Sequence, residues 1–364
     1  MCSSDLFPSH DKSGEFNPED FYADDEMIIT VSHLGYIKRT PLSEFKSQNR
    51  GGVGSKGSSS RDEDFIEYIY PASMHNTMLF FTQKGRCFWL KVYEIPEGNK
   101  TSKGRAIQNM LNIESDDKVN AFVRVANLQD PEYNQSHYLL FCTKQGVIKK
   151  TSLEAYSRPR QNGVNAITIR EDDQVIQVRM TDGNSEILMA NKNGRAIRFH
   201  ETKVREMGRT ATGVRGMTLD GADDEVVGMV CVASDTKDSI LVVSELGYGK
   251  RSDLEDYRIT NRGGKGVKTI NITDKTGKLV TIKNVTDEHD LMIINKSGIT
   301  IRMKVADLRV MGRATQGVRL INLEKRNDQI AAVCRVSSEN EEEEILDSLG
   351  EQPVIESPNL NPEE

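Results

Sequence analysis

Short runs of apolar residues, each followed by a glycine turn and a second run rich in Lys and Arg, recur along the chain. Six such copies lie at residues 27–40, 78–91, 138–151, 187–200, 240–253 and 291–304. The turn glycines are Gly35, Gly85, Gly146, Gly194, Gly247 and Gly298. Glycine supplies the positive φ that a tight β-hairpin needs. The pattern therefore predicts six β-hairpins.

A second glycine follows each turn glycine at a nearly constant distance. The second glycines are Gly54, Gly104, Gly163, Gly213, Gly266 and Gly317, at intervals of 19 residues except for one of 17. A further β-rich run follows each of them, at residues 65–70, 119–125, 175–180, 226–232, 279–285 and 330–336. Each repeat thus holds about four short strands, too few to bury a core alone. Six repeats that shield one another favour a closed ring, so we predict an all-β, six-bladed, propeller-like disc.

Charge is distributed unevenly along the 364 residues, whose formal net charge is −7. Residues 338–364 hold ten acidic residues and no Lys or Arg, and residues 1–26 hold eight acidic residues and one Lys, which leaves +10 for the remainder. A basic body between acidic ends is typical of polyanion binders. We divide the chain into an acidic segment at 1–25, a disc at 26–337 and a tail at 338–364. The composition of the tail predicts disorder and competition with a bound polyanion.

Lys and Arg recur at matching places in the repeats. Equivalent positions in radial repeats lie at equivalent radii, so we predict that these cations form a belt around the rim, suited to the phosphates of a wrapped duplex. Each one alone is more simply explained as solvated surface. The predicted contacts are Lys38, Arg39, Lys149, Lys150, Arg195, Arg198, Arg209, Arg215, Lys250, Arg251, Lys268, Arg302, Arg313 and Arg319.

Two loops combine glycines with cations. The sharper one is TNRGGKG at residues 260–266, and a weaker copy, QNRGGVG, lies at residues 48–54. Glycines let the backbone approach a phosphate while the cations supply charge, although an ordinary connection between blades would also be glycine-rich. Neither loop has the GKS/T of a nucleotide P-loop. The residues assigned to this site are Arg262, Gly263, Gly264, Lys265 and Gly266, with Gln48, Arg50, Gly51, Gly52, Gly54 and Lys56 in the first copy.

These loops resemble the GyrA-box of the DNA gyrase A subunit, whose pattern is approximately Q-[RK]-R-G-G-[RK]-G. The segments EDFYADDEMIITVSHLGYIKRTPLSEF and MGRTATGVRG are similar to the start and the later blades of that family's C-terminal domain. The resemblance implies a six-bladed β-pinwheel whose blades exchange a strand and whose basic rim wraps DNA with right-handed, positive handedness. By position, the first-repeat box is residues 48–54, where Asn49 and Val53 replace two basic residues. We therefore expect the positive charge of the site to be divided between this box and the 260–266 loop.

The resemblance also sets the expected chemistry and partners. No counterpart of the family's cleavage tyrosine precedes Phe21, so we expect no catalytic residue, cofactor or metal here, with ATP and Mg acting in other parts of the holoenzyme. The expected partners are duplex DNA, the gyrase B subunits, plus a second A subunit in an A2B2 enzyme that introduces negative supercoils. The chain itself is expected to be monomeric, cytoplasmic and chromosome-associated, without a membrane partner, and its first dozen residues look like a truncated or artificial start.

Three alternatives remain. The C-terminal domain of a topoisomerase IV A subunit shares such blades, usually fewer of them and without a good box. A protein-binding propeller of the WD40 or kelch type would show recurring Gly-His and Trp-Asp pairs, but the chain has a single Trp. A glycosidase propeller would need paired inward carboxylates, whereas Asp172-Asp173 and Asp223-Asp224 fall in apparent solvated turns.

Overall fold

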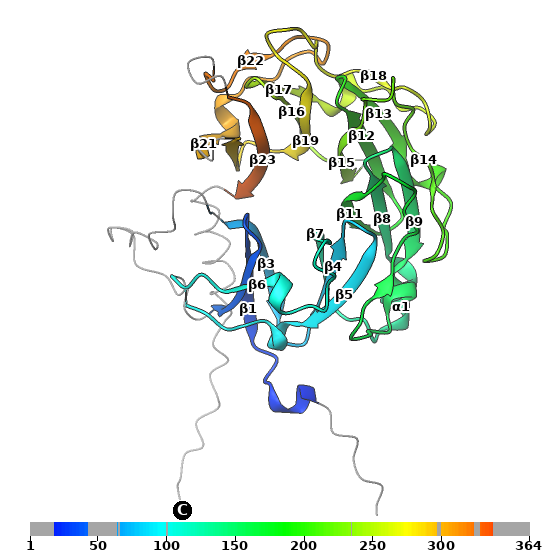
Figure 1. Cartoon of the computed structure of the whole chain (residues 1–364), viewed down its shortest axis with the longest axis vertical. Helices are drawn as coiled ribbons and strands as arrows, with labels where there is room; N and C mark the ends of the chain where they lie inside the picture. The colour runs from blue at the N-terminus through cyan, green and yellow to red at the C-terminus, as the bar shows by residue number, and fades with distance from the viewer. Residues whose placement is uncertain are drawn as a thin grey trace, which may run out of the picture.

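The computed structural model describes residues 18–42, 64, 66–99, 101–233, 235–296, 300–323 and 328–337. Six antiparallel β-sheets stand around a central axis (Figure 1). Five sheets have four strands, and the sixth has three within the described residues. The predicted all-β, six-bladed architecture is confirmed.

A hairpin forms the middle of each blade. The described turn glycines all have positive φ, for example 83° at Gly35 and 82° at Gly194, as the sequence predicts. The hairpins are β1 (Glu26–Ser32) with β2 (Tyr36–Pro41), β4 (Thr77–Thr82) with β5 (Arg86–Lys91), β8 (Tyr138–Thr143) with β9 (Val147–Ser152), β12 (Ser185–Asn191) with β13 (Arg195–His200), β16 (Ser239–Ser244) with β17 (Tyr248–Asp253), and β20 (His289–Asn295) with β21 (Thr300–Lys304).

The inner strand of each blade faces the axis and follows its own hairpin in the chain (Figure 1). The inner strands are β3 (Ile66–Ser73), β7 (Val119–Val125), β11 (Val175–Thr181), β15 (Val226–Ala233), β19 (Leu279–Val285) and β23 (Ile330–Ser337). Neighbouring inner strands lie against one another around the ring. Residues of these strands line a cavity at the centre of the ring.

In each of the first five blades, the outermost strand comes from the following repeat. For example, the chain leaves β5 of the second blade and then pairs with β2 of the first. The outermost strands are β6 (Arg105–Ala106), β10 (Val164–Asn165), β14 (Val214–Arg215), β18 (Val267–Lys268) and β22 (Val318–Arg319). Each described loop that carries a second glycine therefore ends at the outer edge of the preceding blade.

The hydrophobic cores lie between blades. One core joins Leu79 and Phe81 of β4 to Leu139 and Phe141 of β8, and the aromatic rings of Phe81 and Phe141 meet edge to face at 5.2 Å. All six residues of β4 are buried because a neighbouring blade covers each face of the sheet. A single repeat would leave these faces exposed, so the blades depend on one another for stability.

Among the residues that the structure describes, helical structure is limited to short connectors. They are α1 (Pro131–Ser136) and the 3-10 helices Pro18–Phe21, Val92–Glu94, Ile107–Asn109, Leu153–Tyr156, Glu201–Lys203, Leu254–Asp256 and Val305–Asp307. Across the described part of the chain, no helix is long and apolar enough to cross a membrane.

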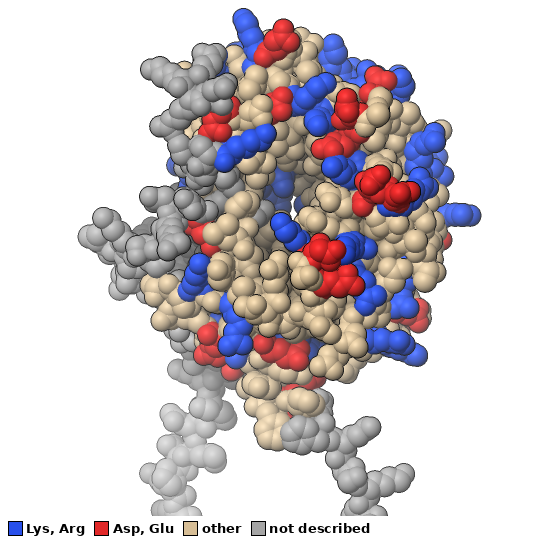
Figure 2. Space-filling view, viewed as in Figure 1, with Lys and Arg blue, Asp and Glu red and all other residues tan. Residues whose placement is uncertain are grey.

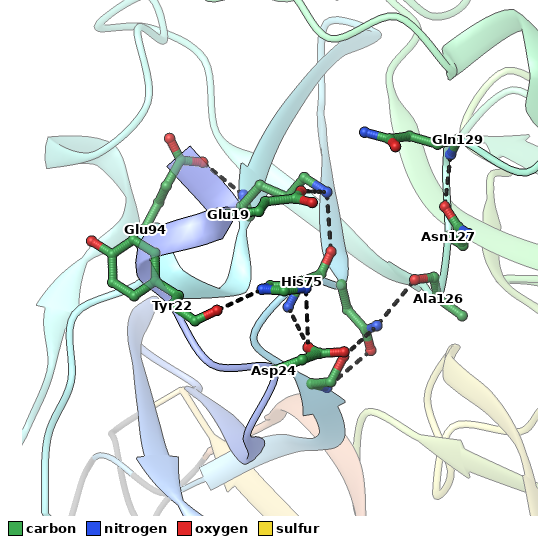
Figure 3. Close-up of polar contacts among 11 residues, drawn as sticks. Glu19, Tyr22, Asp24, His75, Glu94, Ala126, Asn127 and Gln129 are labelled. Carbon is green, nitrogen blue, oxygen red and sulfur yellow. Dashed lines mark hydrogen bonds and ion pairs between the residues drawn. The ribbon is translucent and has the colours of Figure 1, made fainter. Parts of the chain in front are cut away.

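The segment that precedes β1 lies against the second blade (Figure 3). The Glu19 carboxylate is 2.6 Å from Lys91 Nζ, and the Tyr22 ring stacks on Tyr93 with 4.6 Å between centroids. The carbonyl oxygen of Tyr22 lies 2.8 Å from Nε2 of His75. Lys91 ends a hairpin strand, and here its charge is balanced by an acid from outside the repeats.

Candidate nucleic-acid interface

The loops that return to the outermost strands carry many of the exposed cations. Figure 2 shows Lys and Arg side chains projecting from the outer edge of the ring at the upper right, where Figure 1 places β13, β14 and β18. The exposed cations of these loops are Lys103, Arg105, Arg158, Arg160, Lys203, Arg205, Arg215, Arg258, Lys265, Lys268, Arg309 and Arg319. They make up a basic outer edge, which we call the rim.

Two successive loops form the most uniformly basic part of the rim. Residues 258–268 hold four Lys or Arg and no acidic residue, and residues 309–319 hold three and no acidic residue. The preceding loop, at 203–215, holds four cations and the single acid Glu206. Charges of one sign at neighbouring positions add their potentials, so we expect positive potential to be concentrated in this sector.

Each loop crosses the preceding blade at its second glycine. Gly266 has a φ of +73°, and a Cβ atom there would lie 2.3 Å from the carbonyl oxygen of Ala196. Gly104, Gly163, Gly213 and Gly317 have the same positive φ and the same approach to a carbonyl of the preceding blade. Only glycine fits this crossing, which explains the regular interval seen in the sequence.

Arg262 fastens the glycine-rich loop to the preceding blade. Its Nε donates to the carbonyl oxygen of Lys203 at 2.9 Å, and its Nη1 donates to that of Arg215 at 3.0 Å. Arg313 makes the equivalent pair of bonds one blade further on, at 2.9 and 2.8 Å. These bonds use two of the five N–H donors of each guanidinium. Both arginines are half-buried and position their loops.

Lys265 projects from the same loop. Its side chain is 58% exposed, and its Nζ lies 3.0 Å from the equally exposed carboxylate of Asp220. An exposed ion pair of this kind contributes little to stability, so a phosphate could displace Asp220 at small cost. Arg195 is half-buried, and its guanidinium donates to the carbonyl oxygens of Lys265 and Gly266 at 3.2 and 2.8 Å. These two hydrogen bonds help to hold the loop in place.

Three lysines predicted for the rim are buried. Lys38, Lys149 and Lys250 are 6%, 0% and 0% exposed. Nζ of Lys149 donates to the carbonyl oxygens of Ala166 and Arg209, both at 2.6 Å, and the other two lysines bond to carbonyls of the next repeat's loop. Their predicted exposed placement is wrong, because the crossing loops turn carbonyl groups inward and these need buried donors.

The next position along each hairpin strand also serves the junction between blades. Arg198 is 3% exposed, and its Nη1 donates to the carbonyl oxygens of Leu254 and Tyr257, each at 2.9 Å. Its Nε donates to the buried carboxylate of Glu186 at 2.6 Å. The Arg198 guanidinium is therefore buried between blades and is not exposed on the rim, so the prediction of an exposed Arg198 is wrong.

The equivalent cations of the other blades are held in similar ways. Lys150 and Arg251 are 7% and 8% exposed and pair with carboxylates at 3.1 and 2.6 Å. Arg39 is half-buried, and its Nε donates to the carbonyl oxygen of Ile95 at 2.7 Å. The exposed placement predicted for these three residues is therefore wrong. Arg302 is exposed as predicted, and its Nε donates to Asp290 at 2.7 Å.

Burial lowers the pKa of two of the buried lysines, Lys149 and Lys250. The pKa of Lys149 falls to about 7, first through desolvation and then through repulsion from the Arg209 guanidinium. Desolvation lowers the pKa of Lys250 to about 8. A neutral amine retains two N–H donors, so the two bonds of Lys149 to carbonyl groups survive loss of its proton.

Three rim arginines escaped the sequence analysis. Arg205, Arg258 and Arg309 are exposed and stand eight residues before the second glycines of their repeats. The regular spacing was therefore available as a signal. Residues Gln48, Arg50, Gly51, Gly52, Gly54 and Lys56 of the first-repeat box lie outside the described residues, and their role stays a prediction.

The acidic pairs between repeats shape turns. Asp173 accepts a hydrogen bond from the backbone N–H of Gln145 at 2.9 Å. Asp224 is 7% exposed and accepts from Asn191 Nδ2 at 2.8 Å, so it is a buried turn residue and not a solvated one as expected. Within the described ranges, no group of His, Cys, Asp and Glu side chains could hold a metal ion.

All six blades match one family model. The model describes the DNA gyrase C-terminal domain, beta-propeller, and matches residues 26–73, 76–126, 137–182, 185–233, 238–286 and 289–337. The chain belongs to the DNA gyrase C-terminal domain family.

Curated relatives of this gyrase domain are longer proteins. The chain is 43% identical over 343 residues to the DNA gyrase A subunit of Staphylococcus aureus strain NCTC 8325 / PS 47, and 44% identical over 330 residues to that of strain MRSA252. The matches cover 94% and 90% of this chain but only 38% and 36% of those relatives. The chain therefore spans well under half of their length.

Two solved structures share the architecture of this gyrase domain. The C-terminal domain of a DNA topoisomerase IV matches with a TM-score of 0.78 and 26% identity, over 90% of this chain and 98% of that one. A DNA gyrase A C-terminal domain matches with a TM-score of 0.63 and 23% identity, over 85% and 99%. At that identity the second match shows the fold alone.

Proposed function

We propose that this domain binds duplex DNA along the rim and bends it around the disc without reading base sequence. The observation that carries the proposal is the series of acid-free loops, at 258–268 and 309–319, that bring exposed cations to equivalent positions on the outer edge. Phosphate contacts supply affinity and register without base specificity. Smooth bending of a 20–30 bp site costs on the order of 1 to 6 kcal/mol, which several distributed contacts together offset.

In the cell, this domain would act as the C-terminal part of a gyrase A subunit on the bacterial chromosome. Its partners would be B subunits that hydrolyse ATP to drive negative supercoiling, together with a second copy of the A subunit. The 43% identity to a gyrase A subunit supports this role. A role in topoisomerase IV is the second candidate, and the TM-score of 0.78 to such a domain favours it. Pairing the complete protein with B subunits of each enzyme, and assaying for negative supercoils, separates the two.

The salt dependence of DNA binding tests the proposal. For wild type, log affinity for a random-sequence duplex should fall linearly with log salt, with a slope of about −0.9 per phosphate contact. The triple variant R258A/K265A/K268A should flatten that slope by about 2 to 3, since it removes up to three contacts. The control variant K304A removes a lysine outside the rim loops and should change it little. A flat response in wild type would instead indicate a protein-binding propeller.

A further inference from the structure

Two exposed apolar side chains sit among the rim cations. Ile259 is 57% exposed and Val310 is 42% exposed. They are structurally equivalent, because each lies at an isolated parallel bridge to a hairpin strand of the preceding blade, Ile259 to Arg198 and Val310 to Arg251. Two of the large exposed hydrophobic residues thus occupy one position of the repeat.

The same bridge position is acidic where a loop bridges to the first blade and to the third blade. Glu97 bridges to Arg39 and Glu206 bridges to Lys150. A carboxylate at this position would repel a phosphate backbone, whereas an isoleucine or valine would not. The position is therefore acidic in the loops that hold Glu97 and Glu206 and apolar in the acid-free loops at 258–268 and 309–319.

The surroundings of these two residues favour DNA over a protein partner. Ile259 follows Arg258 directly, and Val310 follows Arg309, in loops with four and three cations and no acid. The cores of protein interfaces are depleted in charged residues, so a pair of apolar side chains set among cations is a poor protein-docking surface. Proteins that bend DNA place apolar side chains against base steps in the minor groove, with cations on the flanking phosphates.

We infer that Ile259 and Val310 press into the minor groove of the bound duplex and favour its bending at flexible base steps. The inference rests on the proposed DNA binding at the rim and refines it, because a preference for deformable base steps requires no recognition of individual base edges. Apolar contact is strongest where a step opens readily, and TA steps are among those that kink and unstack easily. The domain should therefore prefer duplexes that present TA steps to the rim once per helical turn.

Binding to two duplexes of equal length and composition tests this inference. One duplex carries TA steps spaced by one helical turn, and the other has them removed. Wild-type chain should prefer the first by about tenfold, given the apolar burial that two such side chains supply. The variant I259A/V310A should lose most of this preference while its salt slope stays unchanged, because no cation is removed. I259L/V310L should keep it.

L34A is the control variant, because it removes a 55% exposed apolar residue outside the rim loops, and it should behave like wild type. The remaining results distinguish failure of the minor-groove contact from failure of DNA binding at the rim. Equal binding of wild type to the two duplexes, or an unchanged preference in I259A/V310A, would overturn the minor-groove contact while leaving rim binding intact. Salt-independent binding of wild type would overturn the proposed function itself.

Discussion

Lys149 and Arg215 show that cations at recurring positions fall into two kinds. Lys149 lies on a hairpin strand between two blades and is fully buried, with its ammonium group on two carbonyl oxygens. Arg215 lies on an outermost strand and is exposed. The first kind compensates polar backbone groups inside the disc, and the second kind faces solvent on the rim. Mutation of a buried cation should lower the stability of the fold, and mutation of an exposed rim cation should weaken DNA binding.

Replacing Lys149 by Met should lower stability and leave the salt dependence of DNA binding in place. Loss of two charge-assisted hydrogen bonds leaves the carbonyl groups of Ala166 and Arg209 without this donor, which costs about 2 kcal/mol in the free energy of unfolding. Urea denaturation measures this change in the free energy of unfolding. R215A is the matched control, with stability changed by less than about 0.5 kcal/mol and a salt slope flatter by about 0.9. The reverse pattern would mean that Lys149 is the phosphate ligand.

The lowered pKa values of Lys149 and Lys250 predict a pH effect. Between their folded pKa values, about 7 and about 8, and the unfolded value of 10.5, the unfolded chain binds more protons. The free energy of unfolding should therefore rise with pH. Burial raises the pKa of the Cys87 thiol, so an opposite trend begins near the ordinary thiol value, about 8.5.

The pH effect should therefore be measured between pH 7 and 8.5. Wild type should gain about 1 to 2 kcal/mol in the free energy of unfolding across this window. The double variant K149M/K250M should lack the lysine contribution and show a flatter profile. Parallel profiles for the two proteins would show that these lysines titrate at ordinary values.

The element that organises the rim is the loop that crosses to the preceding blade. Its second glycine touches a carbonyl oxygen there, and its two-residue strand completes that blade. A substitution at the crossing should loosen the whole loop, since no L side chain fits both the positive φ and the close contact.

Gly266→Ala should destabilise the 260–266 loop. The new methyl group would meet the Ala196 carbonyl oxygen at 2.3 Å with φ at +73°, which should cost about 2 kcal/mol or more. Hydrogen exchange at Val267 and Lys268 should speed up. Gly264→Ala is the matched control in the same loop, because its Cβ would meet nothing closer than 3.6 Å. Equal exchange in the two variants would show that the crossing does not hold the loop.

The spacing of the glycines predicted much of the fold, but it did not predict which Lys and Arg side chains are buried. Hairpins were predictable because the alternation of apolar run, glycine and basic run is local. The burial of Lys38, Lys149 and Lys250 was not, because their acceptors include loop carbonyls about 60 residues further along. An outermost strand of two residues, such as β18, has no periodicity to detect. The strand exchange was expected only from the family resemblance.

At the scale of the ring, the described loops that carry second glycines lie along the outer edge of successive blades. The hydrophobic cores lie between blades, so neighbouring blades hold one another in place, and equivalent loops recur around the edge at similar radius. A duplex that follows this edge must curve. We therefore expect the rim to change the path of DNA and not simply to attract it.

The linking number of plasmid DNA measures this expected change of path. Nicked plasmid would be sealed by ligase with the full chain bound, then freed of protein and analysed on gels. Wild type should shift the linking number in proportion to bound protein, in the positive direction that the family resemblance implies. The rim variant R258A/K265A/K268A should abolish most of the shift, and K304A should retain it. An unchanged linking number at saturating wild-type protein would contradict wrapping around the rim.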